Sequence, residues 1–125
     1  MSPHEQNIFN LVRSELREEF VPSEYRGKVN SEYCGHCHHA TIAMYFLLDG
    51  KNNGYKVRKA IDELMIKHYW LERSDGEIID PTAEQYTKLN RPLPYKECVA
   101  TGVSHLKSKA AKIIIEKVRT KLQSV

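Results

Sequence analysis

The segment at residues 37–48 constrains the fold of this chain more than any other. Its side chains are apolar on most sides of a helix. Such a helix is stable only where other elements cover it, because no face of it suits water. Residues 49–54 contain two glycines and two asparagines, which favour a turn directly after the helix. The segment therefore predicts a buried helix at the centre of a domain.

Two amphipathic helices are expected to cover this central helix. Residues 3–20 carry apolar side chains three to four positions apart, with charged residues between them. Val21 precedes a proline and is therefore pushed out of the α region, and residues 21–36 show no sustained period. Near the C-terminus, Ser104 is expected to cap a helix that continues to Leu122.

The remaining patterns predict a small antiparallel sheet. Residues 64–71 alternate between two faces, and residues 77–80 form a returning strand that Pro81 stops. Residues 55–60 are expected to add a short strand. The order predicts an α+β fold, in which the buried helix packs on the sheet and N- and C-terminal helices flank it.

Length and charge narrow the possible classes of protein. With 125 residues the chain can bury one core, so we expect a single domain at 1–125. The net charge of +3 is spread among acidic residues and does not predict nucleic-acid binding. No apolar run suits a membrane span, and the polar N-terminus lacks a secretory pattern. We therefore expect a cytoplasmic protein whose cysteines are free thiols.

Chemistry is expected at the start of the central helix, where two thiols stand among three imidazoles. The unpaired N–H groups and the dipole of a helix start stabilise a thiolate, which makes Cys37 a candidate nucleophile. Acyl chemistry also needs a base and a group that orients the base. His68 in the first strand of the hairpin and Asp80 at the end of the second are the candidates.

The register of the hairpin decides whether His68 and Asp80 can meet. A three-residue loop, with Gly76 in the left-handed conformation, pairs Trp70 with Asp80 and makes Asp80 the diagonal neighbour of His68. A two-residue turn would pair Leu71 with Asp80 and place the carboxylate on the other face. We predict the three-residue loop.

Three sequence blocks in this order resemble the Cys, His-x-Trp and Asp-Pro-Thr signature of transglutaminase-like proteins in the papain-like superfamily. The blocks are Gly35-His36-Cys37 before an apolar helix, His68-Tyr69-Trp70-Leu71-Glu72, and Asp80-Pro81-Thr82. With Gly76 to Tyr86 and the basic C-terminal helix, they are more closely similar to small phage and bacterial proteins of this type. The resemblance covers roughly residues 30 to 120.

The resemblance implies a papain-like core and a catalytic triad of nucleophile Cys37, base His68 and orienting Asp80. It implies a cysteine-dependent hydrolase or acyl transferase that acts on an amide of a protein, a peptide or a glutamine side chain through a thioester. Cysteine protease, deamidase and transglutaminase activities all belong to this class. No cofactor, metal ion, membrane or nucleic acid is expected, and a phage-encoded member would act in the host cytoplasm.

Other interpretations of the cysteine cluster remain open. Cys34 and Cys37 could form a thiol-disulfide redox pair, although the segment before them lacks the apolar strand of a thioredoxin fold. Zinc could bind both thiols and a histidine, with Cys98 and His105 as a distant second pair, and haem could attach through Cys34, Cys37 and His38. The same fold could also serve as a catalytically idle binding module.

The neighbours of the candidate triad have plainer expected roles. Trp70 is expected in the core or in a cleft wall, and Cys34 and Cys98 are expected to be structural. The three histidines next to Cys37 are expected to be partly exposed; they are His36, His38 and His39. The backbone N–H of Cys37 is the preferred oxyanion donor.

Overall fold

The computed structural model describes residues 1–17, 20, 36–62, 67–88, 90–100 and 108–123. Its helices are α1 (Pro3–Ser14), α2 (Cys37–Leu47), α3 (Gly50–Asn53), α4 (Glu84–Thr87), the 3-10 helix η3 (Tyr95–Glu97) and α5 (Lys109–Gln123). Its strands are β1 (Lys56–Ile61), β2 (Lys67–Glu72), β3 (Ile78–Ile79) and β4 (Val99–Ala100). The mixed helical and antiparallel composition confirms the α+β class. None of the helices in the described ranges is both long and apolar enough to cross a lipid bilayer.

The strands form one antiparallel sheet in the order β3-β2-β1-β4. β1 and β2 pair over their full length and make its centre, while β3 and β4 are short edge strands. Leu71 pairs with Ile79, and the Arg73 N–H donates to the Glu77 carbonyl at 2.8 Å. Gly76 adopts the left-handed conformation with a φ of 88°. The predicted three-residue loop is confirmed, and the alternative pairing of Leu71 with Asp80 is excluded.

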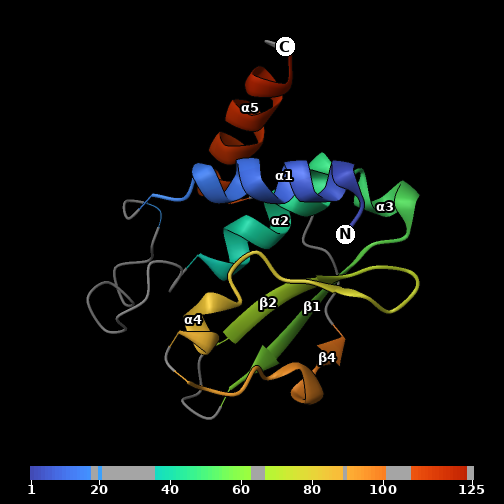
Figure 1. The fold of residues 1–125 in the computed structure, drawn as a ribbon, viewed down its shortest axis with the longest axis vertical. Coiled ribbons are helices and arrows are strands. Elements are labelled where there is room, and N and C mark those ends of the chain that lie inside the picture. The colour runs from blue at the N-terminus through green and yellow to red at the C-terminus, as the bar shows by residue number, and fades with distance from the viewer. Residues whose placement is uncertain (18–19, 21–35, 63–66, 89, 101–107, 124–125) are drawn as a thin grey trace.

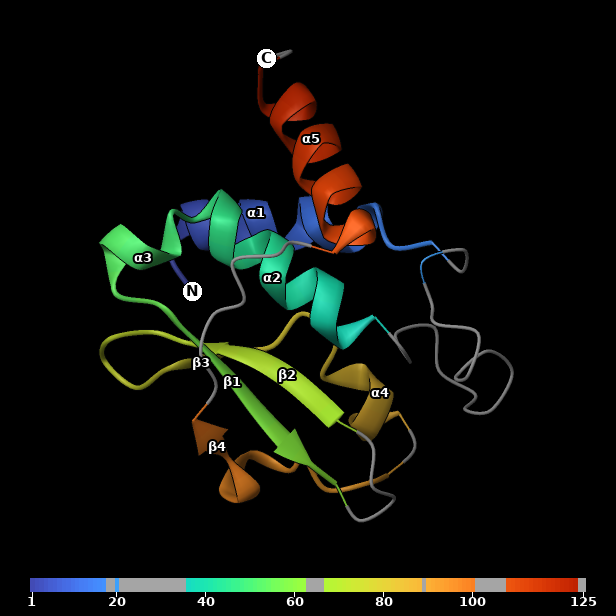
Figure 2. The same ribbon diagram turned by 180° about the vertical axis from the view of Figure 1, so that it is seen from behind.

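Helix α2 is the buried element that the sequence predicts. It packs on β2 and lies between the sheet and the helices α1 and α5 (Figures 1 and 2). Every side chain from His39 to Tyr45 is buried. Apolar residues of α1, α5, β1, β2 and β3 join α2 in one core, with Val12, Leu71 and Ile114 fully buried. The first turn of α2 is thereby held against one end of β2.

Both flanking helices differ from their predicted bounds. α1 ends at Ser14 rather than at residue 20. Its last hydroxyl competes for a backbone carbonyl, since Ser14 Oγ donates to Leu11 O at 2.7 Å. Ser104 lies outside the described residues, and the cap of α5 is Ser108, whose Oγ accepts from Ala111 N at 3.1 Å. The spacing of apolar residues predicts both helices correctly, but local hydrogen bonds decide where α1 ends and where α5 begins.

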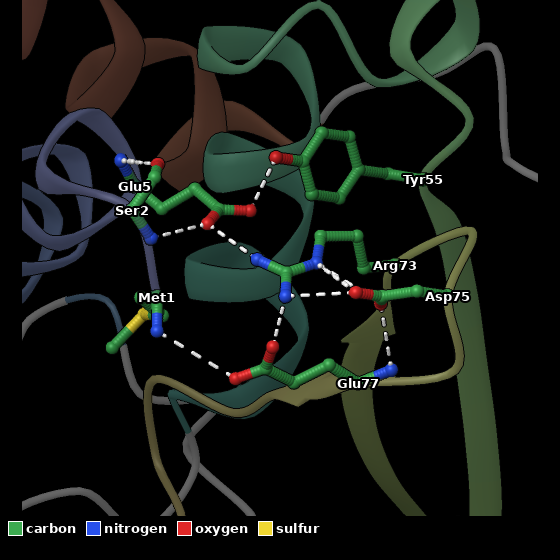
Figure 3. Close-up of polar contacts among 7 residues, drawn as sticks. All are labelled: Met1, Ser2, Glu5, Tyr55, Arg73, Asp75 and Glu77. Carbon is green, nitrogen blue, oxygen red and sulfur yellow. Dashed lines mark hydrogen bonds and ion pairs between the residues drawn. The ribbon is translucent and has the colours of Figure 1, made fainter.

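A cluster of charges ties the start of α1 to the β2–β3 hairpin (Figure 3). The buried Glu5 carboxylate accepts from Tyr55 OH at 2.5 Å and from Arg73 Nη1 at 2.8 Å. Burial raises the pKa of Glu5, but hydrogen bonds from Tyr55 and Ser2 outweigh it, and the net pKa is lowered. Arg73 also pairs with Asp75 in the hairpin loop. The loop that sets the register is thus anchored to a distant helix.

Candidate active site

The Cys37 thiol contacts strand β2 at a position beyond the end of the edge strand β3. β3 contributes only 2 residues, so β2 extends beyond it. Alternate residues of an antiparallel strand direct their backbone groups toward the same side. Arg73 bonds to Glu77 across this side, and therefore the carbonyls of Tyr69 and Lys67 face it as well. The end of β3 leaves these two carbonyls available to side chains.

Two side chains of α2, one turn apart, occupy this open edge. Thr41 Oγ1 donates to Tyr69 O at 3.2 Å, and Cys37 Sγ–H donates to Lys67 O at 3.5 Å. The two carbonyls belong to the residues on either side of His68. These contacts fix the position of α2 along β2 and place the thiol beside the imidazole.

His68 and Asp80 form a buried pair. His68 Nε2–H donates to Asp80 Oδ2 at 2.6 Å, and the exposed fractions of the two side chains are 0% and 3%. The other carboxylate oxygen, Oδ1, accepts from the backbone N–H of Thr82 at 3.1 Å. Asp80 therefore also closes the turn after β3, which is the plainer role for an aspartate before a proline. The structure brings the three predicted residues together, since Cys37 contributes to the electrostatics of His68.

The site favours a protonated imidazole. Burial lowers the pKa of His68, but the hydrogen bond to Asp80 and the nearby Cys37 thiol raise it, and the pKa reaches about 9. The negative charge of Asp80 acts in the same direction. At neutral pH His68 therefore carries a positive charge next to the Cys37 side chain.

The second ring nitrogen of His68, Nδ1, is not used in the bond to Asp80. Nδ1 is buried and has no aligned hydrogen-bond partner among the residues that the structure describes. The Cys37 side chain is near enough to raise the pKa of the His68 imidazole. The hydrogen bond that the Cys37 sulfur makes is to Lys67 O. With Nε2 committed to Asp80, Nδ1 is the atom that can exchange a proton with Cys37 or with a bound substrate.

Aromatic rings enclose the imidazole. Trp70 stacks on His68 with a centroid distance of 5.8 Å and an interplanar angle of 27°, and Tyr86 meets it edge-on at 4.8 Å. Tyr86 is held in place because its OH donates to Asp62 Oδ2 at 2.7 Å, and Arg91 pairs with the same carboxylate at 3.0 Å. Trp70 is 1% exposed, which agrees with its predicted core position. The rings keep water from the charged pair and thereby strengthen its attraction.

Two of the three histidines next to Cys37 are more deeply buried than the sequence predicts. His38 is half-buried as predicted, but His36 and His39 are only 3% and 4% exposed. They face each other, with His36 Nδ1 and His39 Nε2 2.6 Å apart. Burial lowers the pKa of His36 to about 4, and burial and the neighbouring histidines lower that of His39 to about 3. Both rings are neutral, so one donates to the other across the first turn of α2.

The described residues provide no support for the redox and zinc interpretations of the cysteine cluster. Cys34 and His105 lie outside them, so the redox pair and the second zinc pair are not observed. Cys98 is exposed, whereas Cys37 is buried at the helix start. Within the described ranges, no three side chains of histidine, cysteine, aspartate or glutamate gather as metal ligands would.

Three residues near the site were missed from the sequence. Thr41 lies one turn after Cys37 and stands out in the sequence as a polar residue in an apolar helix. Tyr86 and Tyr95 contact His68 and Asp80, but each comes from a segment without a periodic pattern. Comparisons with protein-family models, curated proteins and solved structures find no match. The chemical argument therefore depends on the site itself.

Proposed function

We propose that this chain is a cysteine-dependent hydrolase or acyl transferase of the transglutaminase-like, papain-like class, with Cys37, His68 and Asp80 as its catalytic triad. The observation that carries the proposal is the buried bond of 2.6 Å from His68 Nε2–H to Asp80 Oδ2, in an imidazole whose buried Nδ1 has no aligned hydrogen-bond partner among the described residues. In a catalytic triad a base activates the nucleophile and a third group orients the base, and His68 and Asp80 can fill these two roles for Cys37.

Catalysis would begin with the Cys37 thiolate attacking the carbonyl carbon of a protein or peptide amide. The Cys37 N–H precedes the first hydrogen bond of α2, from Ala40 N to His36 O, and would donate to the oxyanion. As the C–N bond breaks, the His68 imidazolium gives its Nδ1 proton to the departing amine. The acyl group then remains on Cys37 as a thioester.

The second half of the reaction would regenerate the thiolate. Neutral His68 takes a proton from water, the water oxygen attacks the thioester carbonyl, and the C–S bond breaks to release an acid. An amine in place of water would give acyl transfer by the same proton path. Asp80 keeps its charge throughout and orients the imidazole that carries the proton.

Alkylation by iodoacetamide over a range of pH tests the proposal. In the wild-type chain, Cys37 is expected to react well below the usual thiol pKa of about 8.5. The exposed Cys98 provides a reference thiol in the same molecule, and peptide mapping separates the two. The His68→Ala variant should move the reaction of Cys37 to higher pH, whereas the control variant His38→Ala should not.

Three outcomes would count against a catalytic Cys37. If Cys37 reacts with the same pH dependence as Cys98 in the wild-type chain, its thiol is not activated, and the idle binding module is favoured. If Cys34→Ser abolishes thiol exchange with a test disulfide as fully as Cys37→Ser does, the redox pair is favoured. Peptide hydrolysis that persists in Cys37→Ala would show that the nucleophile is misassigned.

A further inference from the structure

Tyr95 makes a contact that the triad alone does not require. Its OH donates to Asp80 Oδ2 at 2.8 Å, and the same oxygen accepts from His68 Nε2–H at 2.6 Å. Tyr95 lies in η3, on the segment that leads from α4 to β4. Two donors from different parts of the chain therefore share one carboxylate oxygen.

The ring of Tyr95 completes a closed set of contacts around the imidazole. It lies against Trp70 with a centroid distance of 5.0 Å, and Trp70 stacks on His68. His68 bonds to Asp80, and Asp80 bonds back to Tyr95. Displacement of any one of these four side chains would disturb the others.

The phenol of Tyr95 is suited to act as a permanent donor. Burial and the charge of Asp80 raise its pKa above the ordinary value of a tyrosine. The OH therefore stays protonated at any pH where the triad could work. A neutral donor takes part of the negative charge of the carboxylate and leaves less of it to act on the imidazole.

We propose that Tyr95 is a positioning residue of the site, which holds the Asp80 carboxylate against His68 and moderates the charge that His68 experiences. This inference rests on the proposed function. Tyr95 touches neither the nucleophile nor the substrate in the mechanism above. It acts through Asp80, and its loss is expected to change the proton affinity of His68 as well as the stability of the fold.

Tyr95→Phe isolates the hydroxyl. Without the phenol donor, the full charge of Asp80 acts on the imidazolium, and His68 should lose its proton at higher pH. A hydrogen bond to a charged group is worth about 1.5–3 kcal/mol, which corresponds to an upward shift of about 1–2 pH units. The measurement is the NMR titration of the His68 ring, together with the upper limb of the Cys37 alkylation profile.

Tyr55→Phe is the matched control. It also removes a phenol-to-carboxylate hydrogen bond, from Tyr55 OH to Glu5 Oε2 at 2.5 Å, but in the cluster between α1 and the hairpin (Figure 3). It should lower stability and leave the His68 titration unchanged. A purely structural Tyr95 would behave in the same way.

A second variant keeps the test open if Tyr95→Phe does not fold. Site-specific 3-fluorotyrosine at position 95 makes the phenol a stronger donor and should shift the His68 titration to lower pH. A folded Tyr95→Phe or fluorotyrosine chain whose titration superimposes on the wild-type curve overturns the positioning role. If the wild-type Cys37 is not activated at all, the proposed function fails, and the inference about Tyr95 falls with it.

Discussion

The substitution Asp80→Asn tests the electrostatics of the candidate site most directly. It keeps the size of the side chain but removes the charge of Asp80, whose hydrogen bond and charge act together with Cys37 to raise the pKa of His68 to about 9. An unfolded histidine has a pKa of about 6.5, so the folded state of the wild-type chain binds the His68 proton more tightly than the unfolded state does. A group whose pKa is raised on folding contributes stability that is complete below the unfolded pKa and is lost as the pH rises through the folded pKa.

The size of this contribution follows from the shift. A difference of about 2.5 pKa units corresponds to about 3 kcal/mol of unfolding free energy at low pH. The contribution should be nearly complete at about pH 6 and close to zero at about pH 10. The pH-dependent contribution of His68 should be smaller in Asp80→Asn over the same range, because the hydrogen bond and the charge of Asp80 are two of the causes of the raised pKa, whereas the contribution of Cys37 remains. A constant difference remains, because the amide cannot accept from both Thr82 N and the two donors at Oδ2.

Urea unfolding at a series of pH values from 6 to 10 measures this difference, with all other titrating groups common to both chains. Glu5→Gln is the control, since it removes another buried carboxylate, one that does not contact His68. A wild-type to Asp80→Asn difference that stays constant from pH 6 to 10 would show that the His68 proton is not linked to folding through Asp80.

Three further substitutions test the placement of the site. Thr41→Val removes the hydrogen bond to Tyr69 O and should lower the free energy of unfolding in urea by about 1 kcal/mol. The alkylation of Cys37 at low pH should also become slower, because α2 is then held less firmly on β2. An unchanged alkylation rate would contradict a role of Thr41 in positioning Cys37. In Gly76→Ala the added Cβ has no atom within 4 Å. The expected loss of about 1 kcal/mol of unfolding free energy therefore comes from backbone strain at a φ of 88°. An unchanged stability would argue against this loop geometry. Glu5→Gln should lower stability by about 1–2 kcal/mol at neutral pH by weakening its pairing with Arg73; loss of this effect in an Arg73→Met background is the expected non-additivity.

The main elements of the fold could be predicted because each left a periodic or local signal. The apolar stretch of α2 required burial, and the alternation in β2 required two different faces. The loop at Gly76 fixed the register, and with it the face on which Asp80 lies. From these signals alone, His68 and Asp80 could be expected to meet.

The rest of the site depends on contacts between segments that carry no periodicity. Tyr95 reaches Asp80 from η3, and a three-residue turn of this kind is set by its surroundings rather than by its own sequence. The pairing of His36 with His39 follows from the burial of α2 on all sides, and the polarity of the two side chains does not by itself indicate that both rings are buried. The bounds of α1 and α5 depended on the hydroxyls of Ser14 and Ser108.

The early end of β3 also matters for association between chains. A strand edge with unpaired carbonyls is a template onto which another chain can add a strand. Here the first turns of α2 cover that edge through Thr41 and Cys37. Thr41 and Cys37 therefore occupy two carbonyl groups that an added strand would need. Variants that loosen α2 from β2 are expected to lose thiol reactivity and to begin self-associating in the same step.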